Sequence, residues 1–158
     1  MILIWLDHSV DVLQPDISHC GGVSEIRRIA AMAEAYDGES CCLDCVQVLT
    51  EEVAIAPHCP LGPIALAACL QIGLCTPNHV IQEMSLGIHY NVQAGDYDIN
   101  SYVHNPAVFD VHDGYVERMT GPGLGIEVNE ALVREVSKNA VPWPLGGFVG
   151  KDGGFREW

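Results

Sequence analysis

Three short apolar runs, each ending in an ionisable residue, constrain this chain more than any other feature. The runs end at Asp16, His58 and Glu83. Runs of this length, bounded by turn residues, suit strands that are buried on both faces of a parallel sheet. In parallel β/α barrels, the side chains that carry chemistry stand at the carboxyl ends of several different strands. We therefore predict three consecutive barrel strands with an acid, a histidine and a second acid on one rim.

Helical patterns follow the first two of these strands. The strands are predicted at residues 10–16, 53–58 and 80–83, and the helices at residues 24–36 and 63–73. Ser24 can cap the first helix, and Pro63 suits the first turn of the second. The second helix is apolar nearly all round, which predicts burial. One face of the first helix carries the apolar residues Ile26, Ile29, Ala30 and Ala33.

The β/α rhythm stops after Glu83. Residues 87–118 suggest irregular structure with short pieces of strand, and the glycines from Gly121 to Gly125 predict a tight turn. Glu130 to Lys138 is expected to form a short helix. The tail from residue 141 is rich in Pro, Gly and Trp and shows no periodicity.

The connection between the first two strands is unusually long. Asp16 and His58 lie 42 residues apart, whereas His58 and Glu83 lie 25 apart, and a β/α unit takes about 30 residues. Removing residues 38–52 would shorten the longer interval to 27. We interpret these 15 residues as an insertion. An intron retained in frame is one hypothesis for its origin, and the coding DNA would test it.

Composition narrows the classes of partner. The formal charge of −14 argues against nucleic acid and anionic membrane surfaces. No apolar run approaches the roughly 20 residues of a membrane span, and the apolar start lacks the basic region of a signal peptide. We expect a cytoplasmic protein with reduced cysteines. A complete barrel needs about 250 residues, so 158 residues can supply only part of one.

The three strand-end residues suit proton abstraction next to a carboxylate. A histidine can act as general base near neutral pH, and an aspartate on its other nitrogen would fix the tautomer. A glutamate that is protonated or shares a proton could stabilise an enediolate. Ordinary polar strand ends on a solvent-facing rim are the alternative. His19 and His89 follow strand ends and could line a substrate pocket, or be structural or exposed instead.

Other motifs carry weaker signals. Cys42 and Cys45 form a lone C-x-x-C that could be a redox pair or half a zinc site, but no second pair lies at suitable spacing. No carboxylate triad on successive strands would hold Mg²⁺. Four further cysteines are predicted to be small buried hydrophobes: Cys20, Cys59, Cys69 and Cys75.

Several long motifs, in the right order, resemble one known family. They are residues Asp11–Gly22, Ala56–Leu70, Gln82–Asn91, Gly121–Val128 and Asp152–Trp158. Together they closely resemble the C-terminal half of D-galactonate dehydratases, in the mandelate racemase branch of the enolase superfamily. The likeness covers nearly all of the chain except its first six or so residues and the suspected insertion.

The resemblance implies an α/β fold: the last three strands of an enolase-superfamily (β/α)₇β barrel, with the C-terminal part of a capping domain. Residues 7–86 would be the partial barrel domain, containing the insertion, and residues 87–158 the C-terminal barrel and capping segment. Family members use Mg²⁺ to dehydrate a sugar acid to a 2-keto-3-deoxy acid. By resemblance, His58 matches the base, Asp16 its partner, and Glu83 the group that stabilises the enediolate.

The same resemblance implies what this chain lacks. The carboxylates that hold Mg²⁺ and the histidine that expels the leaving hydroxyl would lie upstream, so no metal ligand is expected here. We expect the complete parent to be a homo-oligomer acting on a small sugar acid, and this fragment alone to be inactive. The alternatives are another acid-sugar dehydratase or a racemase of the superfamily, or a non-catalytic truncated product.

Overall fold

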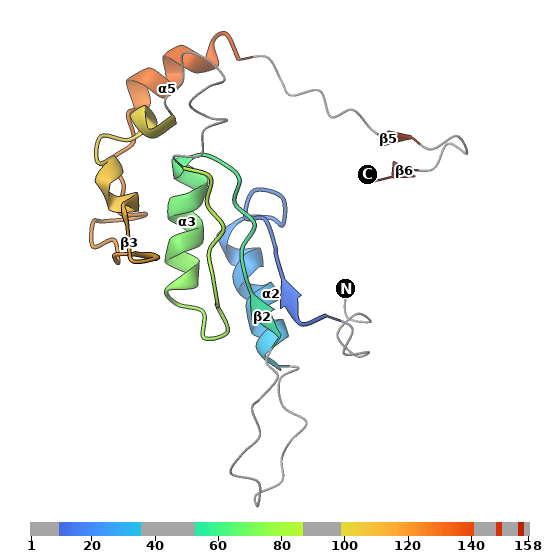
Figure 1. Ribbon diagram of the computed structural model, residues 1–158. Coiled ribbons are helices and arrows are strands. Elements are labelled where there is room, and N and C mark those ends of the chain that lie inside the picture. The colour runs from blue at the N-terminus through green and yellow to red at the C-terminus, as the bar shows by residue number, and fades with distance from the viewer. Residues whose placement is uncertain (1–9, 36–52, 87–98, 141–147, 150–154, 157–158) are drawn as a thin grey trace, which may run out of the picture.

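The computed structural model describes residues 10–35, 53–86, 99–140, 148–149 and 155–156. Two parallel strands and two helices alternate in its first part (Figure 1): β1 (Val12–Leu13), α2 (Val23–Ala35), β2 (Ala54–Ile55) and α3 (Pro63–Gly73). The suspected insertion and His89 lie outside the described residues.

The parallel pairing of β1 and β2 extends past the two strands themselves. Val12 pairs with Ala54 and Leu13 with Ile55, and the backbone N–H of Ala56 donates to the Leu13 carbonyl at 2.9 Å. The same register continues to a bridge between Asp16 and His58. Both predicted strand ends therefore stand side by side at the carboxyl edge of the sheet.

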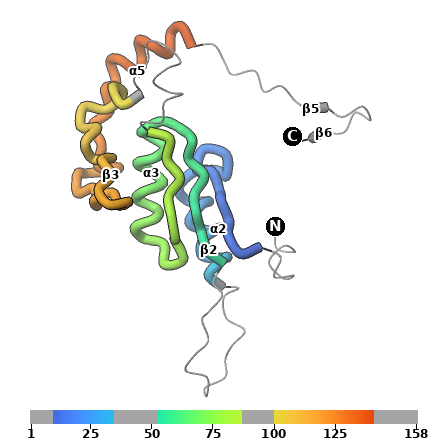
Figure 2. The backbone as a smooth tube through the Cα atoms, in the orientation of Figure 1, coloured from blue at the N-terminus to red at the C-terminus, as the bar shows by residue number. Residues whose placement is uncertain are grey.

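A third segment runs beside β2, as the trace through residues 78–86 shows (Figure 2). The N–H of Ile55 donates to the Asn78 carbonyl at 2.8 Å, and the N–H of Val80 donates to the Ile55 carbonyl at 3.1 Å. His79 forms a parallel bridge with Ile55. The third strand predicted at residues 80–83 is thus only partly right: the pairing lies earlier, and residues 80–83 form no regular strand.

The pairing stops early because of Pro57. In this register the next ladder bond would run from the N–H of residue 57 to the carbonyl of Val80. Proline has no backbone N–H, so that bond cannot form. Pro57 therefore explains why the third segment leaves the regular ladder after Val80, before it reaches Glu83.

Helix α2 packs against both β2 and α3, and the two helices supply half of the buried hydrophobic residues that the structure describes. On α2, Ile26, Ala30 and Ala33 are buried and Ile29 is half-buried, which confirms the predicted face. On α3, five residues are buried: Pro63, Leu66, Ala67, Cys69 and Ile72. The prediction that α3 is buried holds for these five residues but not for Ile64, which is 39% exposed. That residue lines a cavity together with Tyr102 and Leu124.

Residues 99–140 form short elements, some of which pack against α3. They comprise η1 (Ile99–Tyr102), η2 (Pro106–Phe109), the hairpin β3 (Val111–His112) and β4 (Tyr115–Val116), and α5 (Glu130–Ser137). Val103, Phe109 and Met119 join the core around α3. Asn129 caps α5 by accepting a hydrogen bond from the Leu132 N–H at 3.2 Å. The predicted helix from Glu130 is confirmed.

The tail contains one further pair of strands. Strands β5 (Phe148–Val149) and β6 (Phe155–Arg156) pair antiparallel, in a region where the sequence shows no periodicity. No helix among the described residues is long and apolar enough to cross a membrane.

Candidate active site

The sheet register places Asp16 and His58 next to each other. The His58 N–H donates to the Pro15 carbonyl at 3.2 Å, which extends the β1–β2 ladder to His58 itself. After Asp16 the chain turns: the N–H groups of His19 and Cys20 both donate to the Asp16 carbonyl, at 3.1 and 2.8 Å. Gly21, with φ of +108°, supports this turn into α2.

The two side chains form a hydrogen-bonded pair. His58 Nδ1 lies 2.9 Å from Asp16 Oδ2. Because a carboxylate can only accept, Nδ1 carries the proton and Nε2 keeps its lone pair in the neutral imidazole. Asp16 is 8% exposed, whereas the His58 side chain is 43% exposed. The ring is therefore anchored on its buried side, and its basic nitrogen is accessible.

Asp16 is held as a carboxylate by its neighbours. Its Oδ1 accepts the Ser18 N–H at 2.7 Å, and His19 Nδ1 lies 3.9 Å from its Oδ2. Burial by itself raises the pKa of Asp16, but the hydrogen bonds from His58 and Ser18 outweigh that effect and hold the pKa below its ordinary value. The ionised form is thus the one that the fold stabilises beside His58.

Glu83 completes the group from the third segment. Its Oε2 accepts the Cys59 N–H at 3.1 Å and lies 3.9 Å from His58 Nε2. That separation is too long for a direct hydrogen bond. His58 Nε2 and the Glu83 carboxyl are therefore close neighbours that are not bonded to each other. The structure therefore brings together the three residues that the sequence singled out.

The two further histidines predicted to bind substrate are His19 and His89. His19 is close to Asp16, but its side chain is 80% exposed. Its role in substrate binding stays a prediction, as does that of His89, which lies outside the described residues.

Sequence reasoning missed two contributors. The backbone N–H of Cys59 holds Glu83, and the Gln82 side chain donates to two backbone carbonyls, at Pro57 and at Glu83. A backbone contact leaves no signal in residue type. For Gln82, the available signal was its position in the sequence, directly before Glu83 at a predicted strand end.

The four cysteines outside the suspected insertion do not form a uniform class. Cys59 and Cys69 are fully buried, Cys20 is partly buried, and Cys75 is exposed, so the prediction of burial was wrong for Cys75. Cys75 follows the end of α3, where the chain turns at the surface. The hydrogen bond with Cys59, together with burial, raises the pKa of the Cys69 thiol. Buried thiols of this kind are unreactive.

The described residues do not fit the Mg²⁺ that the resemblance implies. They contain no group of three or more His, Cys, Asp or Glu side chains that could hold a metal ion. Both Asp16 oxygens and one Glu83 oxygen are already engaged in hydrogen bonds. We therefore assign neither carboxylate as a metal ligand.

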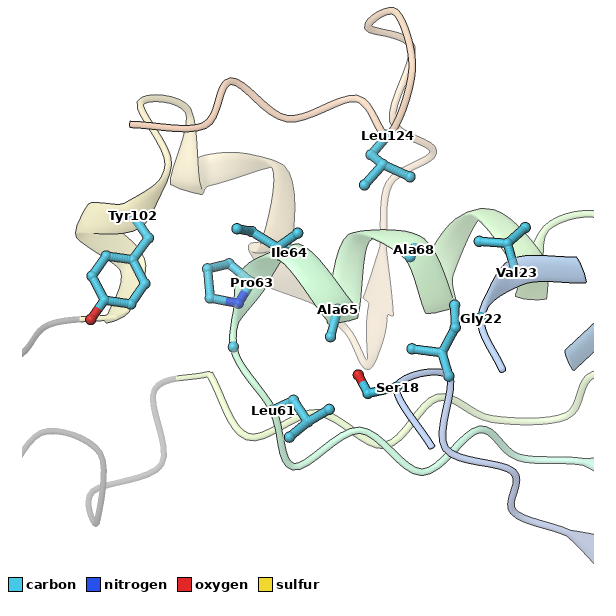
Figure 3. A pocket seen from close by; sticks show the side chains of 12 residues that line it. Ser18, Gly22, Val23, Leu61, Pro63, Ile64, Ala65, Ala68, Tyr102 and Leu124 are labelled. Carbon is cyan, nitrogen blue, oxygen red and sulfur yellow. The ribbon is translucent and has the colours of Figure 1, made fainter. Parts of the chain in front are cut away.

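An apolar cavity of about 520 Å³ lies close to this group, between the turn after Asp16 and the start of α3 (Figure 3). Its main apolar lining residues are Ile17, Val23, Leu61, Pro63, Ile64, Tyr102 and Leu124. Such a lining offers few partners for the hydroxyls of a polar substrate. The accessible face of His58 is the better candidate for the reacting centre.

A family model described as enolase C-terminal domain-like matches residues 4–132. The chain belongs to this family. Within it, the chain is 47% identical over 149 residues to a D-galactonate dehydratase from Ralstonia pickettii, covering 94% of this chain and 34% of that protein. It is 46% identical over 152 residues to a D-galactonate dehydratase from Pectobacterium atrosepticum, covering 96% and 35%. The chain therefore spans about a third of the length of these relatives.

Solved structures of the enolase superfamily share the fold. An enolase from Agrobacterium radiobacter, with bound Na and L-malate, is 32% identical over 96% of this chain and 35% of that one, with a TM-score of 0.65. A mandelate racemase/muconate lactonizing enzyme from Sulfitobacter is 27% identical over 84% and 27%, with a TM-score of 0.59. The predicted family and the predicted piece of an enolase-superfamily barrel are confirmed.

Proposed function

We propose that this chain carries the proton-transfer side of the active site of an acid-sugar dehydratase that acts on D-galactonate. The observation that carries the proposal is the Asp16–His58 pair, with its 2.9 Å hydrogen bond and an accessible Nε2. The relatives named D-galactonate dehydratase, at 46–47% identity, support the choice of substrate.

In this proposal His58 Nε2 removes the proton from the carbon next to the substrate carboxylate. Asp16 keeps the ring oriented and stabilises the imidazolium that forms. A positioned general base typically accelerates such a step by roughly 10²–10⁴-fold. Glu83, protonated or sharing a proton, donates a hydrogen bond to the enediolate. Loss of the β-hydroxyl as water then yields an enol that becomes a 2-keto-3-deoxy acid.

Some parts of this site are proposed to lie outside the chain. The acid that protonates the leaving hydroxyl and the ligands of Mg²⁺ are expected from segments that the longer relatives possess. Mg²⁺ would supply charge stabilisation to the substrate carboxylate. The division into a partial barrel at residues 7–86 and a capping segment at 87–158, the homo-oligomeric parent and the cytoplasmic location are proposed on the same resemblance.

The test is a chimera in which this chain replaces the matching third of the Ralstonia pickettii relative. We expect the chimera to dehydrate D-galactonate and the 158-residue chain alone to have negligible activity. His58→Asn in the chimera should lower kcat by at least about 10³-fold, while Mg²⁺ binding measured by calorimetry stays unchanged. His104→Asn, at an exposed histidine remote from the strand ends, is the matched control. Turnover retained by His58→Asn would remove His58 from the role of base.

A second substrate has one specific observation in its favour. The Agrobacterium structure, 32% identical to this chain, is described as a candidate galactarate dehydratase. Galactarate differs from galactonate in its second carboxylate, so the same proton abstraction could serve both acids. The chimera assayed with each acid separates the two: a higher kcat/KM for galactarate would overturn the choice of D-galactonate.

A further inference from the structure

The three residues of the candidate site are not fixed by the same means. Asp16 and His58 sit on paired backbones, since the β1–β2 ladder runs through to the bond from the His58 N–H to the Pro15 carbonyl. Glu83 lies beyond the last ladder bond of the third segment, which is donated by the Val80 N–H. Pro57 cannot supply the next one. Something other than the sheet must therefore hold Glu83 against His58.

The Gln82 side chain bridges this gap. Its Nε2 donates to the carbonyl of Pro57 at 3.0 Å and to the carbonyl of Glu83 at 2.7 Å. Pro57 immediately precedes His58, so one amide group ties the backbone before the base to the backbone of Glu83. Both N–H bonds of this amide are used. A side chain thus joins the third segment to the Pro57 carbonyl where the regular ladder has ended.

The other end of the same amide has no such partner. Gln82 Oε1 is buried and, within the described part of the chain, accepts no hydrogen bond. A buried acceptor without a partner is destabilising. Stability alone would favour a different side chain at position 82. The presence of glutamine therefore points to the value of the bonds that its Nε2 donates to the Pro57 and Glu83 carbonyls.

We propose that Gln82 is a positioning residue that fixes the Glu83 carboxylate on the Cys59 N–H, beside His58 Nε2. Without this amide, the backbone at Glu83 loses its tie to Pro57 between the Val80 ladder bond and the bond from the Ser85 hydroxyl to the Leu61 carbonyl, and Glu83 leaves the Cys59 N–H. The Asp16–His58 pair, held by the ladder, stays in place. The positioning of Glu83 by Gln82 follows from the contacts in the structure. Its consequence for catalysis rests on the proposed dehydratase function.

Amide hydrogen exchange of the full 158-residue chain tests the placement without any assay of turnover. The variant is Gln82→Met, which keeps the length of the side chain and removes its donors. We expect the Cys59 amide to exchange at least tenfold faster, while the His58 amide, bonded to Pro15, changes less than twofold. Gln71→Met is the matched control, because Gln71 Nε2 also donates to a backbone carbonyl, that of Leu124 at 3.2 Å.

An unchanged Cys59 amide in Gln82→Met would overturn the proposal. If Gln82→Met accelerates exchange at all amides alike, Gln82→Asn decides, because it keeps the amide but is one methylene too short to reach both carbonyls. Selective exposure of Cys59 in that variant supports the proposal, and uniform exposure overturns it.

The chimera adds the catalytic readout. Gln82→Met should lower kcat at least tenfold with KM within twofold, since only the placement of the enediolate-stabilising group changes. A chimera with unmodified Gln82 that shows no turnover would count against the proposed function, while the exchange result on Gln82 would still stand.

Discussion

Asp16 is placed to serve both the fold and the proposed chemistry. Its two oxygens accept hydrogen bonds from the Ser18 N–H and from His58 Nδ1, at 2.7 and 2.9 Å. The first bond belongs to the turn that leads into α2, and the second sets the tautomer of the proposed base. A change at this position should therefore affect stability and proton transfer together.

The stability effect of Asp16 has a defined pH dependence. The folded-state pKa is below the ordinary value of 3.8, so the stabilisation is present above about pH 4 and is lost as the pH falls through the folded pKa. Asp16→Asn should lower the free energy of unfolding by about 2 kcal/mol at pH 7. The difference from the unchanged chain should shrink at pH 3, as urea unfolding at both pH values would measure. A difference independent of pH would contradict this account.

His79 gives a pH dependence of the same sign as Asp16, but at higher pH. Burial lowers its pKa, and its Nε2 is buried without a hydrogen-bond partner among the described residues. The unfolded chain therefore binds the proton more readily, and stability falls as the pH drops below about 6.5. His79→Phe should weaken this fall between pH 7.5 and 5.5 in urea unfolding. His104→Gln, at an exposed histidine, should leave it intact; an unaltered fall in His79→Phe would exclude His79 as its source.

Among the elements, α5 depends most on its own ends. None of its eight residues is buried, so packing contributes little, and an isolated helix of this length is marginal. The Asn129 cap accepts the Leu132 N–H at 3.2 Å. Exposed ion pairs of Arg134 with Glu130 and of Lys138 with Glu135 add little.

Removing the Asn129 cap should therefore destabilise mainly α5 itself. Asn129→Ala is expected to cost about 1 kcal/mol and to speed amide exchange within α5 more than within α3. Asn139→Ala, at an exposed position beyond the helix, is the control. Equal exchange in α5 of both variants would show that the cap does not hold the helix.

For the whole molecule, the sequence predicted the order of helices and the proximity of Asp16, His58 and Glu83 better than it predicted the sheet. Helix periodicity and strand-end residues are local signals, and they located α2, α3, α5 and the three site residues. The strands came out shorter because their pairing depends on a partner backbone and on Pro57, which a single run of residues does not reveal. The exposure of Ile64 and Cys75 depends in the same way on which segments cover them.

The long connection between α2 and β2 offers a test at the scale of the whole fold. Asn78 Nδ2 donates to the carbonyls of Ala30 and Val53, at 3.3 and 2.9 Å. These bonds join the helix to the strand without using residues 38–52. Deleting those residues should keep a single cooperative thermal transition, with Tm unchanged or higher, because a shorter loop costs less entropy to close. Loss of the transition, followed by circular dichroism, would mean that the segment is part of the fold.

The register of β1 against β2 has a consequence for how such a chain can change over time. Asp16 lies next to His58 because of the register in which β1 and β2 pair. The length of the connection between the two strands does not set that register. The gene can therefore gain or lose codons in the connection between α2 and β2 while the pair stays assembled. A shift of the strands by a single residue, in contrast, would turn one of the two side chains to the opposite face of the sheet. The length of this connection can therefore change, whereas the register of β1 against β2 cannot.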